Sequence, residues 1–347
     1  MQELLKWSQR EFKELPWRKN RSLYGTLVSE IMLQQTTVST VKNHFEKFLA
    51  TFPDLESLAE ATEEELLIAW KGLGYYRRAR NLKKIAEILV FEHAGVFPKD
   101  LGTLQKIPGI GPYTSNALLG IGMDEPALAI DANLERVIAR LFGYKSQKGL
   151  KLQKEIYQAF IDKKIFHKVK SYRALNEALM DLGRTYCQAR KASCELCPMK
   201  QDCTGFSSGK PLALPFDAVE KKTLVEHEIY LLRVFILKKD KILVYKKTDG
   251  EWLSGQYEVP TFIMKSTDEK LKQYPMLKIK KVETPLTYKT GITKYKIYNS
   301  IALSDEKFLK RNGFNKTLEW RSITADDANL STATSKGLKK ILDKMIR

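Results

Sequence analysis

Four cysteines, the only ones in this 347-residue chain, fall within a stretch of 17 residues. They are Cys187, Cys194, Cys197 and Cys203. A disulfide framework would spread its cysteines over the fold, and an intracellular chain would not keep it oxidised. Clustered thiols instead point to a metal site, which four thiolates can form with zinc or with an iron–sulfur cluster. Zinc ribbons usually have two C-x2-C pairs, whereas this chain has only one such pair.

The net charge indicates what kind of partner the protein binds. Lys and Arg number 59 and Asp and Glu 41, which gives a formal net charge of +18. Such a charge favours a polyanion, most often nucleic acid, although a solvated Lys-rich surface is the simpler alternative. The apolar stretches are far shorter than the ~20 residues that cross a bilayer, and the first residues lack the apolar run of a signal peptide. We therefore expect a cytoplasmic protein with no membrane partner.

The first part of the chain has helical periodicity up to Cys203. Apolar residues recur every three to four positions over residues 63–70, 79–91 and 132–142, which predicts amphipathic helices there. This part, residues 1–203, is predicted to be an all-α domain.

The pattern changes after that domain. Residues 204–222 contain Gly, Ser and Pro without a period and are interpreted as a linker. Residues 229–237 and 242–245 are β-rich runs separated by Lys-Lys-Asp-Lys, which indicates a hairpin. Residues 223–347 are therefore predicted to form an α+β domain.

A second motif lies in residues 104–120, where Gly109 and Gly111 flank an apolar residue and a helix is predicted to open directly after them. Backbone N–H groups in such a turn are free and lie beside the positive end of a helix dipole, so the turn can bind a phosphate without a charged side chain. An ordinary Pro-Gly turn between two helices is the alternative. The segment resembles the helix-hairpin-helix of DNA repair proteins.

The two motifs together resemble one superfamily. The cysteine spacing, with six, two and five intervening residues, resembles the [4Fe-4S] loop of the endonuclease III superfamily of DNA glycosylases. Within it the chain resembles the adenine DNA glycosylases, the MutY family, along essentially its whole length. The matching segments are Ser29–Thr36, Gly72–Tyr76, Ile130–Asn133 and Asn176–Gly183. The resemblance implies a [4Fe-4S] cluster in the loop 187–203, with Arg190 and Lys191 of that loop at DNA phosphates.

The chemistry that this family performs needs two carboxyl groups. One carboxylic acid protonates the leaving adenine, and a second, ionised carboxylate stabilises the oxocarbenium-like sugar. By resemblance Glu30 is the acid, which then activates water, and Asp131 is the stabilising carboxylate. Glu30 lies among Ile31, Met32 and Leu33, which would raise its pKa if it is buried.

Other positions receive roles through the same resemblance. Gln35 and Tyr75 fill or wedge the base stack once the adenine has left the duplex. Tyr113 supports catalysis and stands where glycosylase/lyases of the superfamily carry a nucleophilic lysine, which implies a monofunctional glycosylase. Asn133 supports the water and Asp131. The residues implied for the adenine pocket are Trp17, Arg18, Leu33 and Glu177.

Residues 223–347 resemble the Nudix-fold domain of the family, on the landmark Trp252, Tyr257 and Pro260. No R-E-x-x-E-E motif is present, so pyrophosphatase activity is not expected. The family recognises 8-oxoguanine through an H-x-[FL]-S-H loop, whereas the aligned residues 290–294 contain no histidine. We expect Thr293 and Lys294 to take over this recognition, with a smaller preference for 8-oxoguanine over guanine.

These observations predict a monomeric, monofunctional glycosylase that removes adenine opposite 8-oxoguanine or guanine from double-stranded DNA. One alternative is a MutY-like glycosylase with altered opposite-base preference. Another is a non-catalytic DNA-binding paralogue, against which the pair Glu30 and Asp131 argues. An endonuclease III-type pyrimidine glycosylase/lyase is disfavoured by Tyr113 and by the additional domain.

Overall fold

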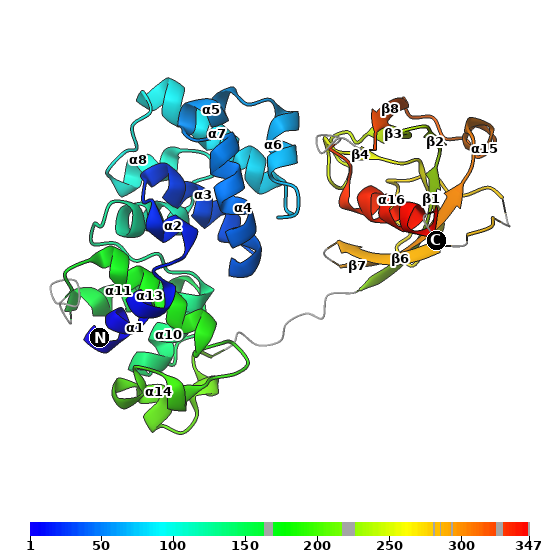
Figure 1. Ribbon diagram of the computed structural model, residues 1–347. Coiled ribbons are helices and arrows are strands. Elements are labelled where there is room, and N and C mark those ends of the chain that lie inside the picture. Colours follow the sequence, from blue (N-terminus) through cyan, green and yellow to red (C-terminus); the bar gives the residue numbers. More distant parts are fainter. Residues whose placement is uncertain are drawn as a thin grey trace. The chain divides into compact units, whose positions relative to one another are not determined.

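The computed structural model describes residues 1–162, 169–216, 226–279, 282–284, 286–292, 294–323 and 329–345. The chain divides into two compact units (Figure 1). The first comprises Met1–Ala61 and Arg77–Lys221, and the second comprises Thr62–Tyr76 and Lys222–Arg347. Residues 217–222 of the predicted linker lie outside the described residues. Within the described part of the chain, no helix has the length and apolar character that a membrane span requires.

The regular elements described in the first unit are helices, as predicted, apart from two isolated β-bridges, Cys187–Ala192 and Gln147–Phe216. Its helices are α1 Gln2–Phe12, α2 Pro16–Lys19, α3 Leu23–Leu33, α4 Val38–Thr51, α5 Leu55–Glu60, α7 Arg77–His93, α8 Leu101–Lys106, α9 Pro112–Ala117, α10 Ala132–Phe142, α11 Leu150–Asp162, α13 Tyr172–Thr185 and α14 Thr204–Ser207. A π-helical turn, Leu118–Gly122, continues α9. Short 3-10 turns lie at Cys194–Leu196, Lys200–Asp202 and Pro211–Ala213.

Local capping explains where the helices that carry the site begin and end. Ser22 caps α3 by accepting the N–H of Gly25 at 2.9 Å. Asp131 caps the start of α10, and Gly143 ends that helix at φ +76°. The predicted helix 132–142 is therefore confirmed at both ends, and the predicted helix 79–91 lies within α7.

The core of the first unit joins α1, α10, α11 and α13 through buried apolar side chains, among them Leu4, Ile138, Phe160 and Leu179. All four cysteines belong to this region, because three of them pack against the same cluster and the fourth, Cys194, lines a cavity with them. The start of α10 and the middle of α13 are thus fixed by burial, which anchors the charged residues that they carry.

The second unit contains two sheets with helices, as predicted for an α+β domain. Its elements are α6 Glu63–Ala69, β1 His227–Phe235, β2 Leu237–Lys238, β3 Lys241–Lys246, β4 Tyr257–Glu258, β5 Thr261–Ser266, β6 Leu286–Ile292, β7 Tyr295–Leu303, α15 Glu306–Arg311, β8 Glu319–Ser322 and α16 Thr332–Met345. One sheet has the order β5-β1-β7-β6, in which β1 and β7 are parallel; the other has the order β2-β3-β4, with β8 beside β3.

The predicted strand 229–237 is wrong as a single element. The first of the two sheets holds it only as far as Phe235, and Leu237 belongs to β2 in the other sheet. The hairpin prediction applies to β2 and β3, which turn at Lys239 with φ +55°. Phe235 and Ile236 are buried in different clusters. A run that is apolar on both faces gives no alternation at which the change of sheet could be seen.

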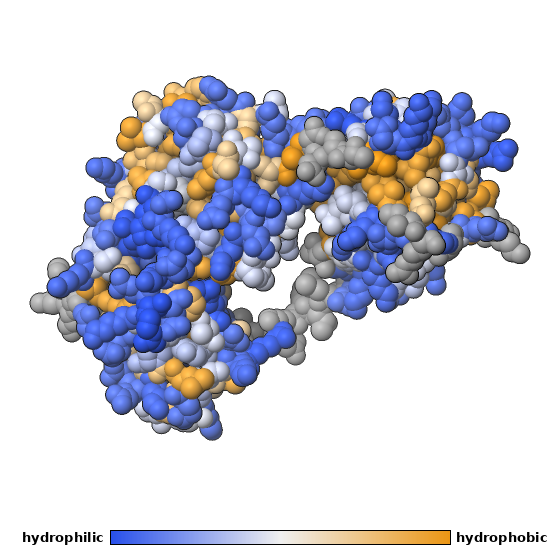
Figure 2. Space-filling view, viewed as in Figure 1, coloured by the Kyte–Doolittle hydropathy of each residue, from blue (hydrophilic) through white to orange (hydrophobic). Residues whose placement is uncertain are grey.

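Helix α16 covers one face of the second unit's core through Leu338 and Ile341, which pack with Phe235 and Ile301. Leu309 of α15 joins a separate cluster around Phe262. The face seen in Figure 2 has hydrophilic side chains over most of its area and smaller apolar patches between them.

Candidate functional site

Glu30 is the central residue of the site. It lies near the end of α3, and its side chain is buried, with the residue only 5% exposed. Burial raises the pKa of Glu30 to about 7, since a carboxylate is poorly solvated there, and the charges of Asp131 and Glu177 act in the same direction. A hydrogen bond from Tyr113 lowers this pKa and limits the rise. The sequence predicted a raised pKa for Glu30 only if the residue is buried, and the structure buries it.

The hydroxyl of Tyr113 donates to Oε2 of Glu30 at 2.5 Å. Tyr113 belongs to α9, just after the glycine turn. The pKa of Tyr113 lies well above its usual value, chiefly because the phenol is buried and then because Glu30 carries charge nearby. Tyr113 therefore stays a neutral donor to the Glu30 carboxyl group.

Asp131 holds a second carboxylate at the start of α10. It accepts the backbone N–H groups of Asn133 at 2.9 Å and Leu134 at 2.8 Å, and Nδ2 of Asn133 at 2.7 Å. Oδ1 of Asn133 in turn accepts Nη2 of Arg136 at 2.8 Å, which fixes the orientation of the amide. Negative charge at this position is favourable, because the helix N-terminus is electropositive.

A pocket of about 490 Å³, partly open to solvent, lies against Glu30. All four residues predicted for the adenine pocket line it. Its lining residues are Leu15, Trp17, Arg18, Thr26, Ser29, Glu30, Leu33, Val38, Ile121, Glu177, Met180, Asp181 and Arg184. The pocket therefore brings residues from α2, α3 and α13 together around one buried acid.

Ion pairs fix the polar side chains of this pocket. Arg18 donates to both oxygens of Asp181, at 2.9 and 3.2 Å, and its Nε lies 3.5 Å from Glu177. Arg21 donates to both oxygens of Glu177, at 2.7 and 3.1 Å. Arg21 and Asp181 were not predicted from the sequence. The one signal for Asp181 was its position four residues after Glu177, on the same face of a helix.

Gln35 and Tyr75, predicted to enter the base stack, share an unusual backbone conformation. Gln35 follows α3 with φ +55°, and Tyr75 has φ +45° and is 55% exposed. Non-glycine residues seldom adopt positive φ, and when they do the site is often functional.

The helix-hairpin-helix motif consists of α8, a turn at Ile107–Gly111, and α9, so it begins slightly before the predicted residue 104. Gly109 has φ +101°, and a Cβ there would lie 3.2 Å from Cδ1 of Ile85. The expectation that all N–H groups of the turn are free is wrong for Ile110, whose N–H bonds to the carbonyl of Ile107 at 3.0 Å. A tight turn satisfies that donor internally.

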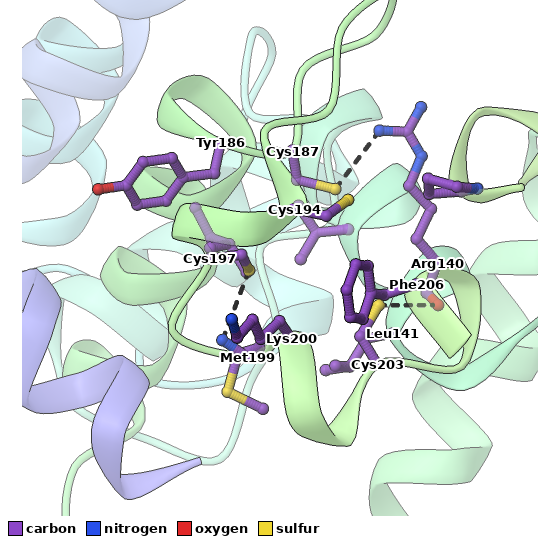
Figure 3. A pocket seen from close by; sticks show the side chains of 13 residues that line it. Arg140, Leu141, Tyr186, Cys187, Cys194, Cys197, Met199, Lys200, Cys203 and Phe206 are labelled. Carbon is purple, nitrogen blue, oxygen red and sulfur yellow. Dashed lines mark hydrogen bonds between the residues drawn. The ribbon is translucent and has the colours of Figure 1, made fainter. Parts of the chain in front are cut away.

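The four cysteines line one pocket in the first unit, and their sulfur atoms face a shared space (Figure 3). Among the described residues, no three His, Cys, Asp or Glu side chains converge closely enough to hold one metal ion. The cavity wall is apolar, with Val137, Leu141 and Phe206. Four thiols around one apolar pocket are a ligand set that an iron–sulfur cluster can use.

Two donors already point at the sulfur atoms. Nη1 of Arg140 donates to Sγ of Cys187 at 3.4 Å, and the N–H of Met199 donates to Sγ of Cys197 at 3.4 Å. These contacts stabilise negative charge on the two sulfur atoms. Burial has the opposite effect on uncoordinated Cys197 and raises the pKa of its thiol to about 11. Binding of a metal group must therefore displace the thiol proton. Arg140 is buried and was not predicted from the sequence.

The remaining predicted residues lie at the surface or outside the described residues. Arg190 and Lys191 are exposed in the first segment of the cysteine loop. Lys294 lies at the β6–β7 turn, 3.8 Å from Asp268. Thr293 lies outside the described residues.

Comparison with known proteins places this geometry in context. Residues 28–177 match the HhH-GPD superfamily of base excision DNA repair proteins. The adenine DNA glycosylase of Buchnera aphidicola subsp. Acyrthosiphon pisum is 32% identical over 72% of this chain and 70% of that protein. The adenine DNA glycosylase of Mycolicibacterium smegmatis is 31% identical over 73% of this chain and 85% of that protein.

A third relative matches a larger share of this chain at a lower sequence identity. The adenine DNA glycosylase of Buchnera aphidicola subsp. Schizaphis graminum is 28% identical over 96% of this chain and 93% of that protein. Among solved structures, a thermostable thymine-DNA glycosylase is 27% identical with a TM-score of 0.52, and the match covers 60% of this chain and 94% of that one.

Proposed function

Because this chain belongs to the adenine DNA glycosylase family, within the HhH-GPD superfamily of base excision DNA repair proteins, we propose that it excises adenine paired with 8-oxoguanine or guanine in duplex DNA. The chain is a DNA glycosylase that acts on N-glycosyl bonds. The observation that carries the proposal is the buried Glu30, bonded to Tyr113 at 2.5 Å, in the wall of the pocket.

Glu30 is suited to both halves of an acid–base cycle. A pKa of about 7 means that near neutral pH a large share of the molecules carries a protonated Glu30, which can donate a proton to the leaving adenine. Once the base has left, the same carboxylate can accept a proton from the attacking water. A buried acid and a separate hydrogen-bonded carboxylate are the pair that glycoside hydrolysis uses.

Asp131 is the second carboxylate in this proposal. Its three hydrogen bonds, from Asn133 and Leu134, fix the position of the carboxyl group at the start of α10. From there it stabilises the positive charge that develops on the sugar as the bond breaks. Asn133 orients the carboxylate and supports the water.

The pocket charges supply selectivity for adenine. Adenine presents an amino donor and ring-nitrogen acceptors. Glu177 can accept from the amino group, and Arg18 can donate to a ring nitrogen, while Trp17 and Leu33 contact the faces of the base. Because Arg21 binds Glu177 and Asp181 binds Arg18, both polar side chains are held in place before the base arrives.

Tyr113 makes the enzyme monofunctional in this proposal. A phenol hydroxyl bonded to Glu30 has no amine with which to form a Schiff base, so the reaction ends at an abasic site.

We infer that Cys187, Cys194, Cys197 and Cys203 hold a [4Fe-4S] cluster, since they surround one apolar cavity. Bound by these four cysteines, a cluster would join the ends of the loop from Cys187 to Cys203. The exposed cations Arg190 and Lys191 of that loop would then be held for contact with DNA phosphates. Gly109 and Gly111 present backbone N–H groups to a phosphate in the same way.

Recognition of the base opposite adenine falls to the second unit in this proposal, which we infer to be Nudix-like. Thr293 and Lys294 occupy the segment that reads 8-oxoguanine in the family. The absence of histidine from residues 290–294 favours a second candidate function, excision of adenine with an altered opposite-base preference. The protein is inferred to act as a monomer on chromosomal DNA in the cytoplasm.

Single-turnover excision from duplexes with adenine opposite 8-oxoguanine, guanine or cytosine tests both candidates. Glu30→Gln and Asp131→Asn should bind the duplex yet cleave about 10²- to 10⁴-fold more slowly. Glu60→Gln, which removes an exposed carboxylate from α5, is the matched control and should cleave normally. Near-wild-type rates in the first two variants would refute the assignment, and binding without any cleavage by the wild type would identify a non-catalytic paralogue.

A further inference from the structure

Arg78, near the start of α7, reaches across to the end of the helix that carries Glu30. Its side chain is buried, with the residue only 9% exposed. Nη1 donates to the carbonyl oxygens of Ile31 at 2.9 Å and Met32 at 2.8 Å, and also to the carbonyl oxygen of Gln34. Nη2 donates to Oγ1 of Thr36 at 3.0 Å. One guanidinium therefore binds four groups on a six-residue stretch of chain.

The bonded groups are those that a helix end leaves without partners. The last carbonyl groups of α3, which ends at Leu33, receive no hydrogen bond from an N–H group of the helix itself. A buried cation at this position satisfies them and also complements the negative end of the helix dipole. Arg78 thus holds the last turn of α3 in place.

The same guanidinium binds on both sides of Gln35. The carbonyl of Gln34 precedes this residue, and the hydroxyl of Thr36 follows it. Gln35 itself has φ +55°, a left-handed conformation that a non-glycine residue keeps only where its surroundings enforce it. The contacts from Arg78, together with the N–H of Thr36, which donates to the carbonyl of Leu33 at 3.3 Å, form these surroundings.

We propose that Arg78 is a positioning residue for base extrusion, which holds Gln35 in the backbone conformation from which its side chain enters the DNA stack. The inference rests on the proposed function, because that function places Gln35 in the stack. Without the guanidinium, the peptide on either side of Gln35 can relax to an ordinary negative φ, and the side chain then leaves the direction that insertion requires.

Arginine suits this task better than other residues. Its rigid fork presents several donors in one plane, so a single side chain can bind acceptors on both sides of a turn. Arg78→Lys keeps the charge but gathers its donors at one nitrogen. Arg78→Met keeps much of the length and loses every donor. The two variants therefore separate the effect of charge from the effect of spanning the turn.

Extrusion can be measured without excision. The probe is a duplex in which 2-aminopurine, a fluorescent adenine analogue that brightens on leaving the stack, replaces the target adenine. Arg78→Met should lower the fluorescence gain on binding by about tenfold, because the lost bonds involve a charged donor. The fluorescence gain of Arg78→Lys should lie between those of Arg78→Met and the wild type. Arg77→Met, which removes an exposed cation next along the same helix, is the matched control and should keep the gain at saturating protein.

Excision rates give a second readout, which a merely structural defect would not produce. Adenine opposite an abasic site has no partner to unpair, so its extrusion costs less. Arg78→Met should excise adenine from a mispair about 10- to 100-fold more slowly than the wild type. On the duplex with the abasic site opposite, the loss should be only a few-fold. An equal loss on both duplexes would overturn the inference.

A double-mutant cycle tests whether Arg78 acts through Gln35. If it does, adding Arg78→Met to Gln35→Ala slows excision little further, whereas fully additive losses would overturn the inference. Should Arg78→Met fail to fold, Arg78→Lys carries the same comparisons. Should the wild type extrude 2-aminopurine in an Arg78-dependent way but excise no adenine, the proposed function fails and the role of Arg78 stands.

Discussion

Replacing the proposed catalytic acid should stabilise the protein in a pH-dependent manner. Burial raises the pKa of Glu30 from 4.5 to about 7. At pH 8 the unfolded chain carries this carboxylate ionised in water, whereas the folded chain must hold the charge in a poorly solvating site. Glu30→Gln removes that penalty, and the amide oxygen can still accept the hydroxyl of Tyr113. The variant should therefore be more stable than the wild type at pH 8 although it no longer excises adenine.

The size of the effect follows from linkage. Between pH 4.5 and 7 the unfolded state has released the proton that the folded state retains, so the free energy of unfolding decreases as the pH rises. With the pKa of Glu30 raised from 4.5 to about 7, the penalty is about 3 kcal/mol at pH 8 and about 1 kcal/mol at pH 5. It disappears when the pH falls below the lower of the two pKa values.

Thermal unfolding at the two pH values checks this reasoning. A domain of this size shifts its Tm by about 2–4 °C per kcal/mol, so Glu30→Gln should raise Tm by about 6–12 °C at pH 8 and by about 2–4 °C at pH 5. Glu60→Gln removes an exposed carboxylate and should leave Tm nearly unchanged at both. An identical Tm difference at pH 5 and pH 8, or a wild type that is the more stable at pH 8, would refute the assignment of a buried, raised-pKa acid.

Four further outcomes are expected. Tyr113→Phe removes the hydrogen bond that lowers the pKa of Glu30, so the alkaline limb of the single-turnover pH profile should move to higher pH; an unmoved limb contradicts the contact. Gly109→Ala, at φ +101°, should cost about 1–2 kcal/mol in urea unfolding and weaken DNA binding, and a stability within ~0.5 kcal/mol of the wild type would speak against it. The wild type should contain about four irons per chain, and Cys194→Ser should lose iron and DNA affinity; one zinc per chain after anaerobic purification would exclude the cluster. Lys294→Ala should make the slope of log binding constant against log salt concentration shallower by up to ~1. An unchanged slope would remove Lys294 from the DNA contacts.

Features that depend on neighbouring residues could be predicted from the amino-acid sequence. The helix 132–142 could be bounded because its capping aspartate, its apolar period and its terminal glycine all lie within a few residues of one another. The cysteine spacing could be read as a metal loop for the same reason. Resemblance to a family then assigned Glu30 and Asp131, since the motifs around them are short and continuous.

Features that join distant segments could be seen only in the folded protein. No local pattern shows that Tyr113 donates to Glu30, 83 residues away, or that the guanidinium of Arg78 binds the end of α3. The burial that raises the pKa of Glu30 and the separation of Phe235 and Leu237 into two sheets also depend on which elements pack together. Periodicity and capping are properties of a few consecutive residues, whereas desolvation and hydrogen bonds across the fold arise only when the packed core brings remote side chains into contact.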